Sequence, residues 1–316
     1  MSKLNSILFF ALLLAACGHL TQYQNADRAP SSVSIPNVLS NVVASDWHYL
    51  NPIIYAFLME ISKNKSVFSL LNVPVSDAER ISVMEPDSPP LSEYDPKSKM
   101  IALSKDICAS PTSTLSPTDF LPALLHEFGH SLFGPNLEIE LSPQLNASAD
   151  QTAYTTLILK GDYLGADQLP AYLREVAAPY HELIADTITI LLLDSPSAMS
   201  DFFEKCGYGA NNRDFSFNYP IEGWNVGPVG GILTDGAHRL FNPVRYHIWQ
   251  SRLSLRDQPN GRALVLQAIV EASISLLRDF YDKKLTRSQW AHYSQEALNR
   301  DLIARFDQIL SQLDGH

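Results

Sequence analysis

The chain has 316 residues, of which 46% are hydrophobic and 18% are charged. This composition supplies enough apolar side chains for a sizeable core, and it excludes an intrinsically disordered chain and a coiled coil. Acidic residues outnumber basic ones by 34 to 23, which leaves a formal net charge of −11. An acidic surface repels phosphate backbones, so we expect no nucleic acid among the partners.

Residues 1–16 are typical of a signal peptide. Lys3 supplies a positive end, and the apolar run from Ile7 to Ala16 is about half as long as the roughly 20 residues that span a bilayer. The run ends in Leu14-Ala15-Ala16-Cys17. This ending resembles the bacterial lipobox, which implies cleavage before Cys17 and lipid on its thiol; an ordinary secretory signal with an incidental cysteine is the alternative. The next residue is Gly18 and not an aspartate, which by resemblance to Gram-negative sorting rules implies the outer membrane.

Residues 17–38 begin with the lipidated Cys17 and are polar and rich in Pro and Ser, so we expect a flexible tether. The rest of the chain, residues 39–316, is expected to form one folded domain. No later segment reaches 18 apolar residues, because the longest run, Leu183–Leu193, contains Asp186. We therefore expect a soluble body that is lipid-anchored at the bacterial cell envelope.

One helix and two strands are expected at the start of the domain. Apolar residues recur near helical spacing from about 45 to 62, where Pro52 indicates a late start or a kink. Two strand-like runs follow at 81–84 and 99–103, separated by a loop rich in Pro and Ser.

Residues 126–130 read His-Glu-Phe-Gly-His, which is an H-E-x-x-H motif. On a helix His126 and His130 lie one turn apart on the same face, so both imidazoles can bind one metal ion. Glu127 lies beside them, where its carboxylate can take a proton from a metal-bound water. Two surface histidines spaced by chance are the alternative interpretation.

The ends of this motif helix can also be predicted. Thr118 or Asp119 can cap its start, with Pro122 in the first turn, and Gly134 is a plausible stop. Residues 135–170 have no clear period and are expected to form a long loop.

A zinc site needs a third protein ligand. The metzincin continuation requires glycine at 133 and histidine at 136, but the chain has Phe133 and Asn136, which excludes that family. Glu182 and Asp186 lie one turn apart in an otherwise apolar helical segment. Buried carboxylates require partners or a metal, and a structural salt-bridge pair is the alternative to a metal site.

These two motifs together resemble the gluzincins, the thermolysin- and neprilysin-like metallopeptidases, in which E-x-x-x-D on a later helix completes H-E-x-x-H. The resemblance implies one zinc ion per chain, held by His126, His130 and Glu182. It also implies that Asp186 orients a ligand histidine through its other ring nitrogen. His181 is the nearest competitor as third ligand, but on a helix it points about 100° away from Glu182.

A third segment, residues 235–245, looks like the neprilysin-type D-x-H with a following proline and arginine, although two residues and not one separate Asp235 from His238. The resemblance implies that His238 stabilises the oxyanion of the tetrahedral intermediate and that Arg245 contacts a substrate carbonyl. A surface histidine and a structural arginine are the alternative. Other candidates for the electrophilic role are Tyr219, Tyr246 and His247.

The remaining elements are two helices, expected around 266–277 and 302–313, and a long loop at 207–236 that is rich in Gly, Asn and Pro. The strand at 99–103 is similar to the edge strand of zincin folds, to which an extended peptide adds by main-chain hydrogen bonds; a strand without that role is the alternative.

Beyond Cys17, the cysteines are Cys108 and Cys206. In an oxidising envelope they can form a disulfide, or they can remain two separate thiols.

The sequence therefore predicts an α+β, predominantly helical, zincin-like domain that acts as a zinc metallopeptidase on peptides or proteins. Two other functions share its features: a non-catalytic zinc-binding envelope lipoprotein, and a peptidase of peptidoglycan cross-links. The sequence does not indicate an oligomeric state.

Overall fold

The computed structural model describes residues 47–71, 82–84, 93–95, 100–103, 107–108, 115–146, 169–208, 213–220, 238–282 and 295–315. The expected signal peptide and tether, with Cys17, lie outside the described residues. So do residues 147–168 of the loop expected at 135–170, and residues 209–212 and 221–236 of the loop expected at 207–236.

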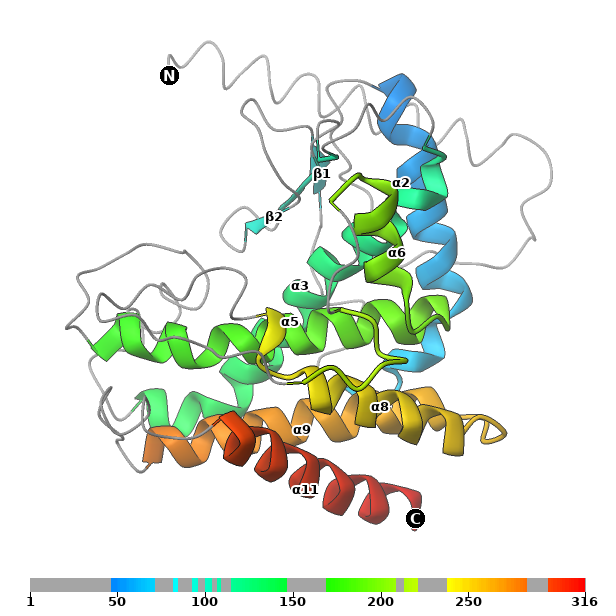
Figure 1. The fold of residues 1–316 in the computed structure, drawn as a ribbon. Helices are drawn as coiled ribbons and strands as arrows, with labels where there is room; N and C mark the ends of the chain where they lie inside the picture. The colour runs from blue at the N-terminus through cyan, green and yellow to red at the C-terminus, as the bar shows by residue number, and fades with distance from the viewer. Residues whose placement is uncertain are drawn as a thin grey trace, which may run out of the picture.

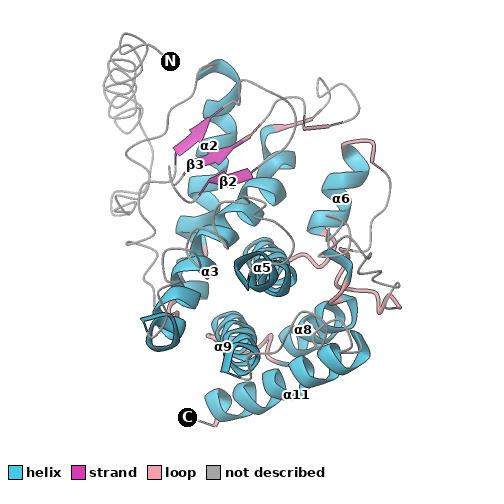
Figure 2. Cartoon of the chain, turned by 90° about the vertical axis from the view of Figure 1, so that its left-hand side faces the viewer, coloured by secondary structure: helices cyan, strands magenta, loops and turns pink. Residues whose placement is uncertain are grey.

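Helix α5, Leu169–Leu193, occupies the centre of the described fold. Every residue from 183 to 192 is buried, because this apolar stretch contacts neighbouring helices on all sides. Figure 2 looks along α5 and shows α3, α6, α8 and α9 around it. The other described helices are α2 (Trp47–Lys63), α3 (Leu121–Asn146), α6 (Ala198–Lys205), α8 (Asn242–Ser254), α9 (Gly261–Asp282) and α11 (Gln295–Asp314).

Three of these helices bear on the sequence-based predictions. Helices α9 and α11 confirm the two helices expected near the C-terminus, and they pack against each other below α5 in Figure 1. Helix α2 confirms the first expected helix but runs through Pro52 without ending. The proline lies close to the start of the helix, where little of the hydrogen-bond ladder precedes it.

A small sheet lies on the other side of α5 (Figure 1). Its strands are β1 (Ser82–Met84), β2 (Glu93–Asp95) and β3 (Met100–Ala102), in the order β1-β3-β2. Strand β3 pairs in parallel with β1 and antiparallel with β2, so Ile101 lies opposite both Val83 and Tyr94. The strand expected at 99–103 is therefore the middle strand and not an edge. The sequence missed β2 because Pro and Ser residues around it indicate a loop.

Helix α3 differs from its prediction at both ends. A short 3-10 helix, η4 (Pro117–Phe120), precedes it, and Ser116 is the cap: its backbone N–H donates to Asp119 Oδ2 at 2.8 Å. At the other end, the helix continues past Gly134 to Asn146. Helical periodicity reports an apolar face and not the helical hydrogen bonds themselves, which is why residues 135–146 read as a loop.

Helices α3 and α5 approach each other closely at Gly129. A Cβ atom added there would lie 2.6 Å from Ala185 Cα and 3.1 Å from Ala185 Cβ. On the other face of α3, Phe128 packs edge-on against Phe57 of α2 and against Phe68, with ring centroids 5.7 and 5.9 Å apart. Phe68 ends η2 (Lys65–Phe68), a 3-10 helix that follows α2. Glycine thus brings the motif helix close to α5, and the aromatic cluster holds it there.

The segment after β3 is joined to the end of α6. A disulfide links Cys108 to Cys206, which caps α6. Beside it, Tyr208 donates its hydroxyl hydrogen to the carbonyl oxygen of Ile107 at 2.7 Å. Lys205 Nζ lies 2.5 Å from Asp119 Oδ1, which ties α6 to the start of α3. Of the two states left open by the sequence, the structure has the bonded one.

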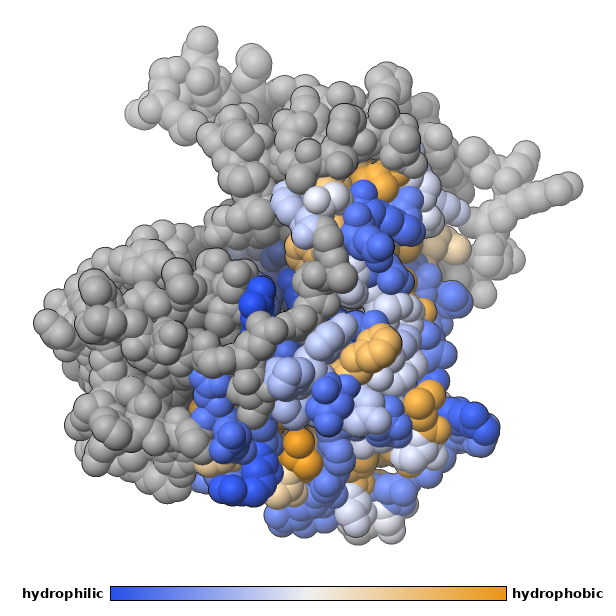
Figure 3. All heavy atoms as spheres, viewed as in Figure 1, coloured by the Kyte–Doolittle hydropathy of each residue, from blue (hydrophilic) through white to orange (hydrophobic). Residues whose placement is uncertain are grey.

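Most described residues are helical, which confirms the predominantly helical expectation. The sheet contributes only three short strands, so the described fold is helical with a minor sheet. On the face in Figure 3, the described surface is mostly hydrophilic with isolated hydrophobic residues. No single described helix is long and apolar enough to cross a membrane. One pair of helical segments, Pro179–Leu193 and Ala198–Lys205, together has the length and composition of a membrane span, but the two segments are bent by 94° relative to each other.

Candidate metal centre

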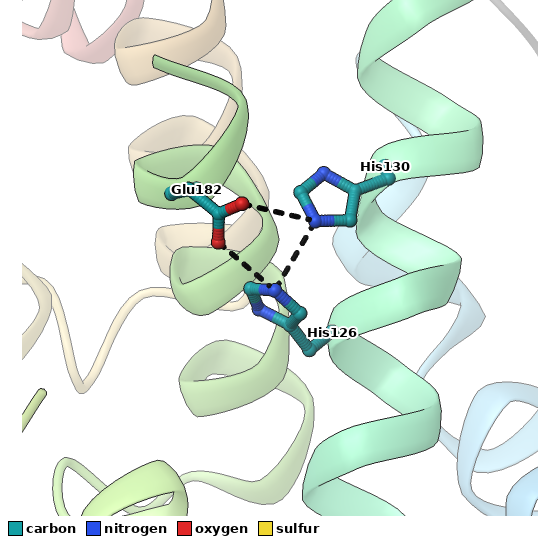
Figure 4. Close-up of side chains that lie close together, drawn as sticks. All are labelled: His126, His130 and Glu182. Atoms are coloured by element: carbon teal, nitrogen blue, oxygen red, sulfur yellow. Dashed lines mark hydrogen bonds and ion pairs between the residues drawn. The ribbon is translucent and has the colours of Figure 1, made fainter. Parts of the chain in front are cut away.

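His126, His130 and Glu182 point toward one another across the contact between α3 and α5 (Figure 4). The two Nε2 atoms lie 3.1 Å apart. Glu182 Oε2 lies 3.1 Å from Nε2 of His126, and Oε1 lies 3.7 Å from Nε2 of His130. The structure thus brings together the three residues that the two motifs predicted as metal ligands.

The separations between these atoms fit a zinc ion. Zinc binds histidine nitrogen and carboxylate oxygen at about 2.0–2.2 Å in tetrahedral sites, which places neighbouring ligand atoms about 3.4 Å apart. The two imidazole nitrogens are 3.1 Å apart, and the two oxygens of Glu182 lie 3.1 Å (Oε2) and 3.7 Å (Oε1) from them, which is close to that value. Two imidazoles and one carboxylate are also a donor set typical of zinc.

The second ring nitrogen of His126 faces Asp186. Its Nδ1 lies 3.0 Å from Asp186 Oδ1, and Asp186 is fully buried. A carboxylate in this place fixes the ring so that Nε2 faces the other two ligands. Asp186 therefore lies where the resemblance implied a residue that orients a ligand histidine.

Two arginines flank Asp186. Arg245 donates from Nε and Nη2 to Oδ2, at 3.0 and 2.8 Å. Arg213 donates from Nε to both carboxylate oxygens at 3.1 Å, and its Nη2 contacts Oδ1. Although burial by itself raises the pKa of Asp186, the two guanidinium groups hold that pKa far below its usual range.

The titration of the histidines follows from their neighbours. Burial and Arg213 lower the pKa of His126, but hydrogen bonds to Asp186 and Glu182 outweigh them and raise it to about 9. Burial lowers the pKa of His130 to about 3. Burial opposes ionisation of Glu182, yet His238, His130 and His126 hold its pKa well below the usual range. At neutral pH Glu182 is thus anionic and His130 neutral, as metal ligands must be, whereas His126 is protonated and would release a proton when a metal binds.

Glu127 lies on the sheet side of the centre. It is buried, and its Oε2 accepts a hydrogen bond from the backbone N–H of Tyr94 at 2.9 Å. Tyr94 belongs to β2, the edge strand that contacts α3. A backbone N–H therefore fixes the carboxylate expected to act as the base.

His238 and Arg245 occupy different environments. His238 Nε2 lies 2.8 Å from Glu182 Oε2, and 28% of its side chain is exposed, so it borders the site. Arg245 is 1% exposed and holds Asp186, with its guanidinium 5.9 Å from the ring centre of Phe215. The expectation that Arg245 contacts a substrate carbonyl is wrong, because a buried arginine paired with an aspartate cannot reach a substrate.

The remaining candidates have other neighbours. His181 lies against Phe133, with ring centres 4.7 Å apart, and does not belong to the ligand group. His247 Nε2 lies 2.6 Å from Asp307 Oδ1, which ties α8 to α11. Tyr219 packs near Phe217, while for Tyr246 the structure shows only partial burial.

Sequence reasoning missed Arg213 and the backbone of Tyr94. Neither belongs to a motif, and a backbone donor has no residue-type signal. Buried Asp186 was a usable signal, because an ionised carboxylate in an apolar helix demands cationic partners.

A scan of models of protein families, a search of curated proteins and a search of solved structures all find no match to this chain.

Proposed function

We propose that this chain is a zinc-dependent peptidase, anchored by lipid on Cys17 at the bacterial cell envelope. One observation carries the proposal: Nε2 of His126, Nε2 of His130 and a carboxylate oxygen of Glu182 lie within 4.8 Å of one another, with Glu127 next to His126 on the same helix. A bound zinc supplies a Lewis acid that lowers the pKa of water and polarises a peptide carbonyl.

The chain's own residues take distinct roles in this proposal. Glu127 accepts the proton of the attacking water and passes it to the leaving amine, and the Tyr94 N–H at 2.9 Å keeps its carboxylate in place. His238 borders the ligand group and would donate a hydrogen bond to the developing oxyanion. The zincin-like class of the domain is part of the same proposal.

A non-catalytic zinc-binding lipoprotein is the second candidate. It is favoured by the short contact of 2.8 Å between His238 Nε2 and Glu182 Oε2, which brings a third imidazole to the ligand group. A protein ligand in the fourth position closes a zinc site to substrate, and closed sites are structural. The described ligand group contains only His126, His130 and Glu182, so we retain the peptidase as the primary proposal.

Elemental analysis of the purified protein, paired with hydrolysis of a quenched peptide library, tests the proposal. We expect about one zinc ion per chain. The Glu127→Gln variant should keep its zinc and lose at least about 100-fold in turnover, since a general base contributes about 10²–10⁴-fold. A Glu127→Gln variant with wild-type turnover contradicts the mechanism, and zinc without cleavage in either form favours the second candidate.

The Glu182→Ala variant tests the third ligand separately. We expect it to lose zinc, because two histidines alone leave the site one ligand short. Zinc content that survives this change would identify His181 or Asp186 as the true ligand.

A further inference from the structure

Asp186 is flanked by two buried guanidinium groups. Arg245 alone makes two hydrogen bonds to Oδ2 and neutralises the charge. Arg213 adds a second buried guanidinium. Its charge lies close to His126, which would bind a metal cation. Glu182 and Glu127 also lie close enough to stabilise the charge of Arg213, so the local charges are balanced, but repulsion between this guanidinium and a metal ion would by itself weaken cation binding.

Arg213 differs from Arg245 in what it reaches. Its Nη2 lies 2.9 Å from His126 Nδ1, while its Nε contacts both oxygens of Asp186. His126 Nδ1 also lies 3.0 Å from Asp186 Oδ1. Nδ1 donates its proton to Asp186 and a guanidinium N–H can only donate, so Arg213 acts on the ring through the carboxylate: its planar fork fixes Asp186, and Asp186 fixes His126.

The segment that carries Arg213 is itself fixed in place. The backbone N–H of Phe215 donates to the carbonyl oxygen of Pro196 at 3.0 Å, and Phe215 is fully buried. The guanidinium of Arg213 lies 5.3 Å from the ring centre of Phe203 on α6. Backbone, aromatic ring and carboxylate together restrict Arg213 to one orientation.

We propose that Arg213 is a positioning residue of the metal centre: it locks Asp186 and His126 into the arrangement that presents His126 Nε2 to the metal. The inference rests on the proposed zinc site. Mutation of residues that orient a ligand histidine typically lowers metal affinity by about 10–100-fold, so the effect is measurable.

The test is the zinc dissociation constant of the purified protein, measured by competition with a chromogenic chelator. Arg213→Lys keeps the charge but cannot hold the Asp186 carboxylate through two nitrogens in one plane, so we expect zinc affinity to fall by about tenfold. Arg213→Met should lose about 10–100-fold. A role through charge alone predicts the opposite sign for Arg213→Met, which would then bind zinc more tightly than the wild type.

Arg252→Met is the matched control. Arg252 also pairs with an aspartate, Asp194, at 3.0 Å, but Asp194 is half-exposed and contacts none of the described site residues. This variant should keep wild-type affinity. As a second readout, the visible absorption of bound cobalt(II) should change in Arg213→Lys and stay unchanged in Arg252→Met, because it reports the ligand geometry.

Each outcome decides between the interpretations. Weaker zinc binding in both Arg213 variants, with the control unchanged, supports positioning; if Arg213→Met does not fold, Arg213→Lys decides. Wild-type affinity in Arg213→Lys, or tighter binding in Arg213→Met, overturns the inference while leaving the zinc site intact. A wild-type protein that binds no zinc refutes the proposed function and this inference together.

Discussion

His126 uses its two ring nitrogens for different purposes. Nε2 lies 3.1 Å from the facing atoms of His130 and Glu182, and Nδ1 lies 3.0 Å from Asp186. A carboxylate at Nδ1 keeps the proton on that nitrogen, so Nε2 is the nitrogen that would give up its proton and bind a metal. The arrangement of one imidazole thus depends on residues of α5 and on the segment that carries Arg213.

Replacement of His238 separates the two proposed functions at the level of a residue. If His238 donates to the oxyanion, His238→Ala should retain zinc and lose about 10²–10³-fold in turnover with a small change in KM. If His238 instead closes the metal site, the same variant should bind zinc more weakly. Zinc affinity and steady-state kinetics, measured on one preparation, provide both readouts. Unchanged turnover would remove His238 from the mechanism.

Among single residues, the sequence predicted site residues that lie on the same helix. It missed those that come into contact only through the tertiary fold. His126 and His130, like Glu182 and Asp186, are one turn apart, so helical geometry alone places each pair on one face. Arg213 reaches Asp186 across 27 positions of the chain, and no local period encodes that contact. Arg245 was found but misassigned, because a motif gives a residue's place in the chain and not its burial.

Between elements, the decisive contact is the approach of α3 to α5 at Gly129. A side chain there would meet Ala185 Cα at 2.6 Å, so Gly129→Ala should push the helices apart and weaken zinc binding. Overpacking costs about 1–3 kcal/mol, partly offset by the roughly 1 kcal/mol better helix propensity of alanine. Zinc affinity is therefore the sharper readout than the free energy of unfolding.

Gly315→Ala provides the matched change where there is room. An added Cβ at Gly315 has its nearest neighbour at 3.4 Å, an ordinary contact, so neither zinc affinity nor stability should fall. Wild-type zinc affinity in Gly129→Ala would show that the ligand geometry tolerates a wider separation of α3 and α5.

Element boundaries were less predictable than the elements themselves. The C-terminal helices α9 and α11 could be predicted because each buries a continuous apolar stripe. The extension of α3 past Gly134 and the strand β2 could not, since neither has an apolar period of its own. Strand β2 matters for the site, because the Tyr94 N–H that holds Glu127 belongs to it.

Over the whole molecule, composition predicted a large core, and the centre of that core is α5. Which helices surround α5 was not predictable, because apolar stripes do not identify their partners. The consequence for function is that the ligand set forms only when two distant segments meet: α3 carries the histidines and α5 the carboxylate. Features that hold distant segments together therefore support the site without touching it.

The Cys108–Cys206 disulfide is the strongest such feature, because it joins residues 98 positions apart and the closed loop contains all three ligands. In the chain-entropy account a loop of that length contributes about 4–5 kcal/mol, and removal of a native disulfide typically costs about 2–5 kcal/mol. We expect the Cys108→Ala, Cys206→Ala double variant to lose that much free energy of unfolding in urea. Reductant should lower the stability of the wild type and leave the double variant unchanged. Equal stability of the two proteins without reductant would mean that packing alone holds α6 and the segment after β3 together.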